Sequence, residues 1–143
     1  AASGSGGTQA GLLAGRAVAG RGPRVIGVDV AKGGGELRDI VASLAAGCLE
    51  LLGSGARVPP DDVVLVDGAG PGYGQVFPAS RDAILTVLRA EGLLLDPVYT
   101  SKAFAAIPGL IAGGTIGRGD SVVFLHTGGL GALFAPVYAE ALR

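Results

Sequence analysis

Three short, mostly apolar segments rich in β-branched residues place the strongest constraint on how this chain can fold. They are RVIGVDV at residues 24–30, VVLV at 63–66 and SVVFL at 121–125. Segments of helical composition or periodicity surround them, at residues 9–19, 36–52, 81–91, 102–112 and 130–142. Apolar strands that alternate with helices form parallel sheets covered on both faces. We therefore expect an α/β fold with three α/β/α layers and a mainly parallel sheet, and we expect Pro108 to end or kink its helix.

The composition limits the class of protein. The chain has 143 residues, enough for one domain with a core of its own. Apolar residues make up 49% and charged residues 16%, which is typical of a globular chain. The formal net charge is −1 and no basic run occurs, which argues against nucleic acid and anionic membranes as partners. The sequence shows no apolar run of membrane-spanning length and no signal peptide, so a cytoplasmic location is expected.

The chain has one cysteine, Cys48, and one histidine, His126. A disulfide within the chain is therefore excluded, and a zinc site of cysteine and histidine ligands cannot be built. We expect no metal site. The sequence contains no methionine and begins with Ala1-Ala2 just before a glycine-rich loop, so we expect it to be part of a larger protein.

A loop rich in glycine and hydroxyl groups, SGSGGTQAG at residues 3–11, runs directly into the first predicted helix. Its glycines let the backbone approach a ligand closely, and its Ser and Thr hydroxyls add hydrogen-bond donors. The free N–H groups and the positive dipole end of the following helix favour a negative charge. The segment therefore predicts a loop that binds a phosphate group.

A dinucleotide site is one alternative for this loop. Asp29 ends a strand about twenty residues after the glycines, where NAD-binding folds carry an acidic residue for the ribose. The GxGxxG spacing fails, however, because Gln9 stands where the third glycine is needed. A dinucleotide-binding oxidoreductase is therefore the last of our hypotheses, and Asp29 is interpreted as a strand-end residue in a loop.

Other phosphate-binding and hydrolytic motifs do not occur in the sequence. Neither Lys32 nor Lys102 stands in the GK[ST] context of a nucleotide P-loop. No GxSxG motif indicates a serine hydrolase. His126, alone at the end of a predicted strand, is interpreted as a structural, hydrogen-bonded histidine.

Four motifs, in order along the chain, carry a resemblance to a known family. Besides SGSGGTQAG they are AGPGYG at residues 69–74, LDPVYTSKA at 95–103 and FLHTGG at 124–129, followed by Leu133-Phe134. Over nearly its whole length the chain resembles the pyridoxal-phosphate enzymes of fold type II, the tryptophan-synthase-β type. Within that type it is similar to the branch of D-cysteine desulfhydrase and 1-aminocyclopropane-1-carboxylate deaminase.

The resemblance implies which residues hold pyridoxal phosphate. Ser5, Gly6, Gly7 and Thr8 match the loop that binds the phosphate of the cofactor. Thr127 matches the residue that faces the pyridine nitrogen, and a helix N-cap is its alternative role. A neutral hydroxyl does not keep that nitrogen protonated, so the ring is a weaker electron sink and elimination of a good β-leaving group is favoured.

Two tyrosines are implied to act on the substrate. Tyr73 and Tyr99 match the family's active-site tyrosines, which manage protons or orient the substrate carboxylate. For Tyr73 the alternative is an aromatic residue that shields its loop. Thr100 follows Tyr99 where the deaminases carry an acidic residue, so YTSKA is closer to the desulfhydrase pattern. Ser101 replaces a usual glycine, which leaves the shape of the substrate open.

The family's lysine, which binds the cofactor covalently, lies in the N-terminal portion of the complete enzymes. Lys32 and Lys102 do not match it, and both are interpreted as solvated surface residues. We therefore hypothesise that residues 1–143 form a single α/β domain that binds the cofactor phosphate. It would be roughly the C-terminal half of a larger enzyme and inactive alone.

For the complete enzyme the resemblance implies a homodimer that acts as a pyridoxal-phosphate-dependent lyase on a small amino acid. An α,β-elimination of the D-cysteine desulfhydrase type would give pyruvate, ammonia and sulfide. Deamination of 1-aminocyclopropane-1-carboxylate is the alternative in the same class. A non-catalytic α/β binding fragment that lacks the lysine is the alternative from another class.

Overall fold

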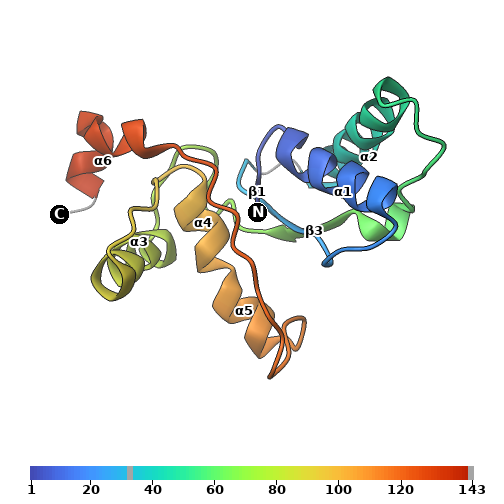
Figure 1. Cartoon of the computed structure of the whole chain (residues 1–143). Coiled ribbons are helices and arrows are strands. Elements are labelled where there is room, and N and C mark those ends of the chain that lie inside the picture. The colour runs from blue at the N-terminus through green and yellow to red at the C-terminus, as the bar shows by residue number, and fades with distance from the viewer. Residues whose placement is uncertain (32–33, 142–143) are drawn as a thin grey trace.

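The computed structural model describes residues 1–31 and 34–141, which form a parallel sheet with helices on both faces (Figure 1). Three strands pair in the order of the sequence: β1 (Ala2–Ser3), β2 (Ile26–Asp29) and β3 (Val64–Asp67). Ser3 pairs with Asp29 and Asp29 with Asp67, so the carboxyl ends of the strands meet at one edge. The expected α/β fold with a parallel sheet is confirmed.

One face of the sheet is covered by two amphipathic helices, α1 (Gly7–Ala19) and α2 (Gly34–Leu51). Buried apolar side chains of α2 pack against Ala10 and Leu13 of α1. The buried residues of α2 recur every fourth position, at Leu37, Val41, Ala45 and Leu49. This spacing keeps them on one stripe of the helix. Both helices are predicted by the sequence, and in the structure each begins slightly earlier.

The other face of the sheet is covered by α4 (Thr100–Ala105), and α3 (Pro78–Glu91) packs against α4. Ala103 of α4 lies on Val28 and Val30 of the sheet, whereas the next two residues of α4 pack against α3. Figure 1 shows α3 and α4 on the side of the sheet opposite α1 and α2. The three predicted layers are therefore present.

The helix predicted at 102–112 is divided into α4 and α5 (Ile107–Ala112). Pro108 stands in the first turn of α5, where its missing N–H is not needed. The division confirms that Pro108 interrupts the helix.

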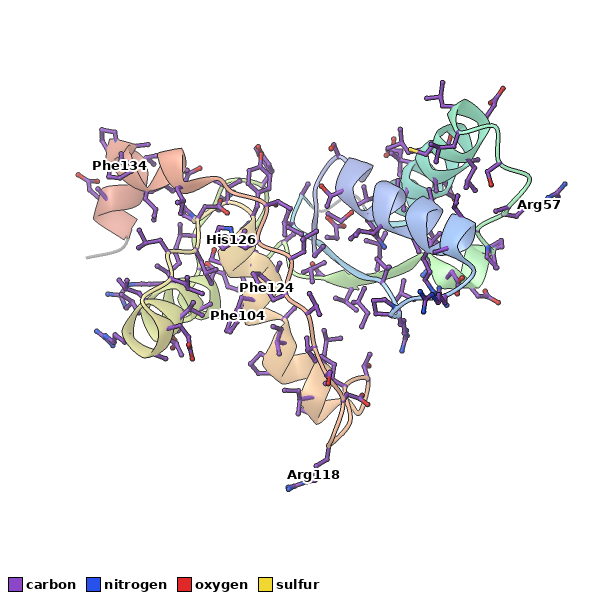
Figure 2. The ribbon with its side chains drawn as sticks, viewed as in Figure 1. Arg57, Phe104, Arg118, Phe124, His126 and Phe134 are labelled. Atoms are coloured by element: carbon purple, nitrogen blue, oxygen red, sulfur yellow. The ribbon has the colours of Figure 1, made fainter. Side chains whose placement is uncertain are left out.

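The prediction of a third buried strand at 121–125 is wrong for this structure. Val122 is 52% exposed and Val123 82% exposed. Phe124 packs edge-on against Phe104 of α4, with ring centroids 5.4 Å apart (Figure 2). Apolar β-branched residues favour extended backbone, but a strand also needs a neighbouring backbone to pair with. Among the described residues this segment has no strand beside it and lies on the α3–α4 layer instead.

The helix predicted at 130–142 is replaced by two short ones, a 3₁₀ helix η2 (Leu130–Phe134) and α6 (Pro136–Ala141). Ala135 separates them in an extended conformation, which the steric clash with the following proline ring favours. Another 3₁₀ turn, η1 (Pro60–Asp62), precedes β3. In the described part of the chain no helix is long and apolar enough to cross a membrane.

Candidate functional site

The glycine-rich loop connects β1 to α1 at the carboxyl edge of the sheet. Gly6 precedes the helix with φ of 85°, and a Cβ at this position would lie 2.9 Å from Val41 Cγ2. Only glycine meets both conditions without strain. The N–H of Ala10 donates to Gly6 O at 2.9 Å, and the three N–H groups before it have no helical carbonyl one turn earlier. No side chain caps this helix within the described residues, so its N-terminus is open to an anion.

Ser3 adds an unpaired hydroxyl next to this loop. It ends β1, it is 1% exposed, and its Oγ has no hydrogen-bond partner among the described residues. Buried hydroxyls are normally hydrogen-bonded, so an orphaned one calls for an explanation such as a ligand. Ser5, Gly7 and Thr8 are exposed in the same loop. Apart from Gly6, which is buried, the residues predicted to bind phosphate are thus exposed, at the end of the loop and in the first turn of α1.

Gln9, the residue that breaks the dinucleotide motif, is buried between α1 and the sheet. Its Nε2 donates to Val64 O of β3 at 2.8 Å. A Cβ on Gly27 of β2 would collide with its carboxamide, so glycine is required beneath it. Gln9 therefore ties the start of α1 to two strands.

Asp29 has a structural role in the loop after β2. Its Oδ1 accepts a hydrogen bond from the N–H of Ala31 at 2.9 Å, and its Oδ2 accepts one from the N–H of Gly34 at 2.8 Å. These bonds support its interpretation as a strand-end residue. Across residues 1–31 and 34–141, no group of three or more His, Cys, Asp or Glu side chains could hold a metal ion.

Tyr73 and Tyr99, far apart in the sequence, are brought together by the fold. Their hydroxyl oxygens are 2.5 Å apart, and their rings meet edge-on with centroids at 6.0 Å. The ring of Tyr99 also lies on the phosphate loop, since a Cβ on Gly4 would be 3.6 Å from Tyr99 Cε1. The tyrosine pair therefore borders the loop predicted to hold the cofactor phosphate.

The hydrogen bond with Tyr73 is the main cause that raises the pKa of Tyr99 to about 12. Partial burial and the negative charges of Tyr73, Asp96 and Tyr138 raise this pKa further. Tyr99 therefore keeps its phenolic proton at neutral pH. It can donate a hydrogen bond or a proton, but it is not a ready base.

Asp96 fixes the backbone that carries Tyr99. Its fully buried carboxylate accepts hydrogen bonds from the N–H groups of Val98, Tyr99 and Thr100 at 2.7–2.8 Å. The Thr100 hydroxyl donates to Asp96 Oδ1 and accepts from the Asp96 N–H, both at 2.7 Å. The Thr100 hydroxyl, directly after Tyr99, is thus hydrogen-bonded within the protein. Gly129 packs against this carboxylate so closely that a Cβ would lie 2.6 Å from Asp96 Cγ.

Thr127 lies on an exposed turn that His126 anchors beside α4 (Figure 2). His126 Nε2 bonds to Leu94 O at 2.7 Å, and Nδ1 accepts from the N–H of Gly128 at 3.2 Å. The proton therefore belongs on Nε2, and the structural interpretation of His126 is confirmed. Gly129, not Thr127, occupies the cap position of η2, so the alternative role of Thr127 as a helix N-cap is wrong.

Lys102 is fully buried, and its prediction as a solvated surface residue is wrong. Its Nζ donates to Ala69 O at 2.7 Å and to Gly72 O at 2.6 Å, and it lies 5.9 Å from the centroid of the Phe77 ring. Burial lowers the pKa of its amino group. The other lysine named above, Lys32, lies outside the described residues.

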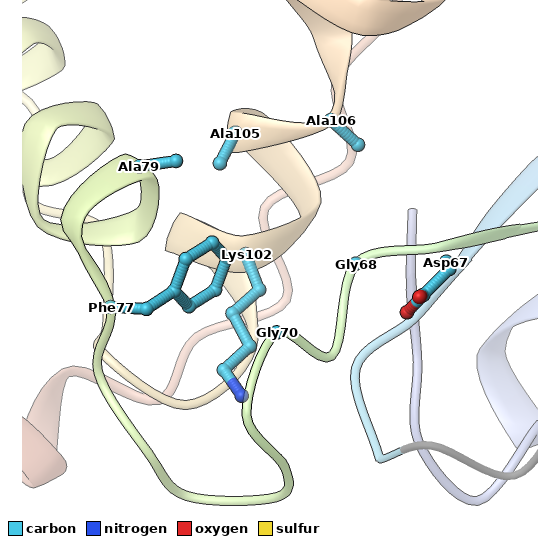
Figure 3. A pocket seen from close by; sticks show the side chains of 8 residues that line it. All are labelled: Asp67, Gly68, Gly70, Phe77, Ala79, Lys102, Ala105 and Ala106. Atoms are coloured by element: carbon cyan, nitrogen blue, oxygen red, sulfur yellow. The ribbon is translucent and has the colours of Figure 1, made fainter.

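A cleft of about 240 Å³ opens beside the Lys102 stem, between α3, α4 and the loop after β3 (Figure 3). It is lined by Asp67, Gly68, Gly70, Phe77, Ala79, Lys102, Ala105 and Ala106. None of the predicted cofactor or tyrosine residues belongs to this lining. The cleft is therefore a neighbour of the candidate site and not the site itself.

Sequence reasoning missed three residues that shape the tyrosine site: Asp96, Lys102 and Tyr138. The Asp-Pro pair just before a helix is a capping signal that identifies Asp96 in principle. Lys102 stands one helical turn after Tyr99, but nothing local shows that it is buried. Tyr138 of α6 has its hydroxyl 3.3 Å from where a Cβ on Gly74 would lie, and no sequence signal indicates this.

Comparison with known proteins matches residues 1–128 to a family described as pyridoxal-phosphate dependent enzymes. A Pyrococcus abyssi protein, provisionally named 1-aminocyclopropane-1-carboxylate deaminase, is 40% identical over 92% of this chain and 38% of its own length. A Burkholderia vietnamiensis protein of that name is 37% identical over 97% of this chain and 41% of its own. The crystal structure of an ACC deaminase homologue matches with TM-score 0.86 and 35% identity, over 99% of this chain and 41% of that one. The chain thus spans about two fifths of the length of these relatives.

Proposed function

Because the chain belongs to the family of pyridoxal-phosphate-dependent enzymes, on the branch that includes 1-aminocyclopropane-1-carboxylate deaminase, we propose that it is the domain of such an enzyme that binds the cofactor phosphate. Residues 1–143 form one α/β domain in this proposal. We propose that they are the C-terminal portion of a longer protein, as the resemblance implies; the chain spans about two fifths of the length of each relative.

The loop at the carboxyl edge of the sheet fits a phosphate group. The observation that carries the proposal is the open N-terminus of α1 beside the orphaned, buried hydroxyl of Ser3. Gly6 makes the turn into α1 at positive φ and packs against α2, where a Cβ would collide with Val41. In the proposed site the phosphate is held by Ser5, Gly6, Gly7 and Thr8. Thr127 is proposed to face the pyridine nitrogen.

When bound, pyridoxal phosphate supplies an electron-withdrawing ring that stabilises negative charge at the α-carbon of an amino acid. The chain itself supplies a proton held between Tyr73 Oη and Tyr99 Oη. Tyr73 is 58% exposed, so its hydroxyl is open to a substrate, while Tyr99 rests on the phosphate loop. We assign this pair the tasks of holding a proton and orienting the substrate carboxylate.

The names of the relatives favour 1-aminocyclopropane-1-carboxylate as the substrate of the whole enzyme. The reaction would open the ring and release ammonia and 2-oxobutyrate. Desulfhydration of D-cysteine, our first hypothesis from the sequence, is therefore the second candidate.

A specific observation supports the second candidate, desulfhydration of D-cysteine. Thr100 replaces the acidic residue of the deaminase pattern, and its hydroxyl is engaged with Asp96 rather than free to meet a ligand. Thr127 is neutral as well. A pyridine nitrogen without an acidic partner favours elimination of a good β-leaving group, such as the thiol of D-cysteine, to give pyruvate, ammonia and sulfide.

The covalent step of this family needs a lysine that the described residues do not provide. The amino group of Lys102 is buried and bound to two carbonyls, so it is not free to bind the cofactor. We therefore expect the 143-residue chain alone to be inactive as an enzyme. A non-catalytic binding module remains the alternative from another class, and the homodimer of the whole enzyme stays a prediction.

The test is a product assay on the protein expressed with the coding sequence upstream of Ala1. Formation of 2-oxobutyrate from 1-aminocyclopropane-1-carboxylate supports the first candidate. Pyruvate and sulfide from D-cysteine alone support the second. Absence of both products, together with no cofactor absorbance after pyridoxal phosphate is added, would contradict the proposal and favour the binding module.

A further inference from the structure

Lys102 is a buried cation that binds backbone carbonyls instead of a carboxylate. Its Nζ donates to the carbonyl oxygens of Ala69 and Gly72, and no carboxylate in residues 1–31 and 34–141 forms an ion pair with it. Burying an ammonium group without a counter-charge is unfavourable, and burial lowers the pKa of Lys102 accordingly. An apolar side chain would fill the same space without this cost. What Lys102 contributes must therefore lie in the two carbonyls that it holds.

Those carbonyls belong to the glycine-rich loop that carries Tyr73. Gly70 has φ of 60° and Gly72 has φ of 152°, so the backbone on the way to Tyr73 adopts conformations that favour glycine. Glycine-rich backbone loses more conformational entropy on ordering than any other, so such a loop needs ties to hold one shape. The Gly72 carbonyl is a tie placed one residue before Tyr73.

The same helix end carries Lys102 and Tyr99. Tyr99 is the residue that precedes α4, and Lys102 stands within its first turn. The helix is held in turn by the Asp96 carboxylate, which accepts the N–H groups of Tyr99 and Thr100. Lys102 and Tyr99 are therefore both carried by the N-terminal end of α4, whose backbone Asp96 holds.

We propose that Lys102 is a positioning residue that ties the Tyr73 loop to α4 and so brings the Tyr73 hydroxyl onto the Tyr99 hydroxyl. Two kinds of contact join loop and helix end: Nζ to the Ala69 and Gly72 carbonyls, and hydroxyl to hydroxyl at 2.5 Å. If the first is removed, the glycines on both sides of Tyr73 let the second open. The meaning of this tie for catalysis rests on the proposed function, but the tie itself does not.

The pKa of Tyr99 reports whether Lys102 ties the Tyr73 loop to α4. The hydrogen bond with Tyr73 is the largest cause of its raised pKa, with burial and the charges of Tyr73, Asp96 and Tyr138 as the others. Loss of the tie should therefore lower the pKa of Tyr99. When Lys102 loses its proton at high pH, its neutral amine keeps two N–H groups, one for each carbonyl, so the tie persists during the titration.

The first experiment is an alkaline titration of tyrosinate absorbance in the chain and its variants. Tyr99→Phe identifies the signal of Tyr99. In Lys102→Met, which keeps the stem and removes the charge, the pKa of Tyr99 is expected to fall from about 12 toward 10.0, as it should in Tyr73→Phe. Arg118→Met, at the exposed loop tip after α5 in Figure 2, removes one positive charge and should leave the titration unchanged. A folded Lys102→Met protein whose Tyr99 still titrates near 12 overturns the proposal.

A second measurement, on Lys102→Ala, tests the proposal if the Lys102→Met variant does not fold. The cleft beside the Lys102 stem gives small amines access to Lys102→Ala. At neutral pH, ethylammonium chloride should raise the thermal midpoint of Lys102→Ala and not that of the wild type. Tetramethylammonium, which has no N–H to donate, should not do so. Equal effects of the two cations overturn the proposal.

Product formation separates the tie from the proposed function. In the longer protein, Lys102→Met and Tyr73→Phe should both lower the rate by about 10- to 100-fold, because small misplacements of a catalytic group have effects of this size. A shifted Tyr99 titration with an unchanged rate would support the tie and contradict the role assigned to the tyrosine pair. An unchanged titration would overturn the tie, whatever the rate.

Discussion

The helices on the two faces of the sheet are held in place by different kinds of contact. On one face, α1 and α2 meet through a continuous apolar stripe. On the other face, α4 begins with three successive buried polar residues, Thr100, Ser101 and Lys102, and the buried Asp96 stands just before it. Apolar packing is non-directional and fixes where a helix lies, whereas hydrogen bonds to buried polar groups fix individual atoms. The tyrosine pair lies on the face of α4, where hydrogen bonds to buried polar groups fix individual atoms.

The largest expected effect is a test of the polar face. Asp96→Ala leaves the buried N–H groups of Val98, Tyr99 and Thr100 without their acceptor. Each unsatisfied buried donor costs about 1–3 kcal/mol, so we expect a loss of about 4 kcal/mol in the free energy of unfolding, measured with urea.

Asp120→Ala is the matched control for this test. Asp120 accepts a similar hydrogen bond from the N–H of Gly117, but in an exposed loop. We expect it to lose less than about 1 kcal/mol, because water replaces the carboxylate. Equal losses in the two variants would show that burial is not what makes the Asp96 hydrogen bonds of the polar face stabilising.

The second test addresses the apolar face. Leu13→Ala removes a side chain that is 2% exposed from the α1–α2 stripe, and a loss of about 3 kcal/mol is expected from the cavity. Leu12→Ala, one residue earlier and 38% exposed, is the control and should lose much less. Tyr99 should titrate as in the wild type in both variants. A changed Tyr99 titration in Leu13→Ala would mean that the two faces are not independent.

The third test uses pH. Below about pH 10 both the folded and the unfolded chain hold the Tyr99 proton, so its contribution to stability is fully present. Between about 10 and 12 the unfolded chain loses this proton while the folded chain keeps it, so the free energy of unfolding falls as pH rises. Tyr73→Phe should make that fall smaller, which urea midpoints on either side of this window would show. Tyr138→Phe, whose charge is the last of the causes, should change it less.

The smallest expected effect concerns the phosphate loop. Ser3→Ala removes a hydroxyl with no protein partner in the described structure, so the thermal midpoint should not fall. If this hydroxyl binds the phosphate, the affinity for pyridoxal phosphate, measured by equilibrium dialysis, should weaken by about 3- to 10-fold. Ser101→Ala removes another buried, unpartnered hydroxyl, in α4, and should leave the affinity unchanged. The same affinity in both variants would argue against phosphate at this loop.

The apolar face is the part of the fold that the sequence predicts well. The repeat of Leu37, Val41, Ala45 and Leu49 is a local pattern with helical period, and its buried partner surface follows from it. The strands at 24–30 and 63–66 are short, apolar and bounded by turn residues, so their existence is also a local property, although β3 is only half-buried where β2 is buried. The proposed phosphate loop is predicted in the same way, because its glycines and hydroxyls stand in consecutive residues.

The polar face is where local patterns mislead. Residues 121–125 have the composition of a buried strand, but pairing depends on a neighbouring backbone that composition does not reveal. Lys102 has the composition of a surface residue, yet the carbonyls of Ala69 and Gly72 hold it in the interior. Both errors concern contacts between segments far apart in the sequence.

The parallel α/β class, the amphipathic helices and the family resemblance all follow from the sequence alone, because each depends on residue types at short, regular spacing. The contact of Tyr73 with Tyr99 and the hydrogen bonds from Lys102 to the Tyr73 loop follow only from the folded chain. Hydrogen bonds between distant segments need atoms placed within a few tenths of an ångström. That placement comes from the packing of the whole chain and not from any one segment.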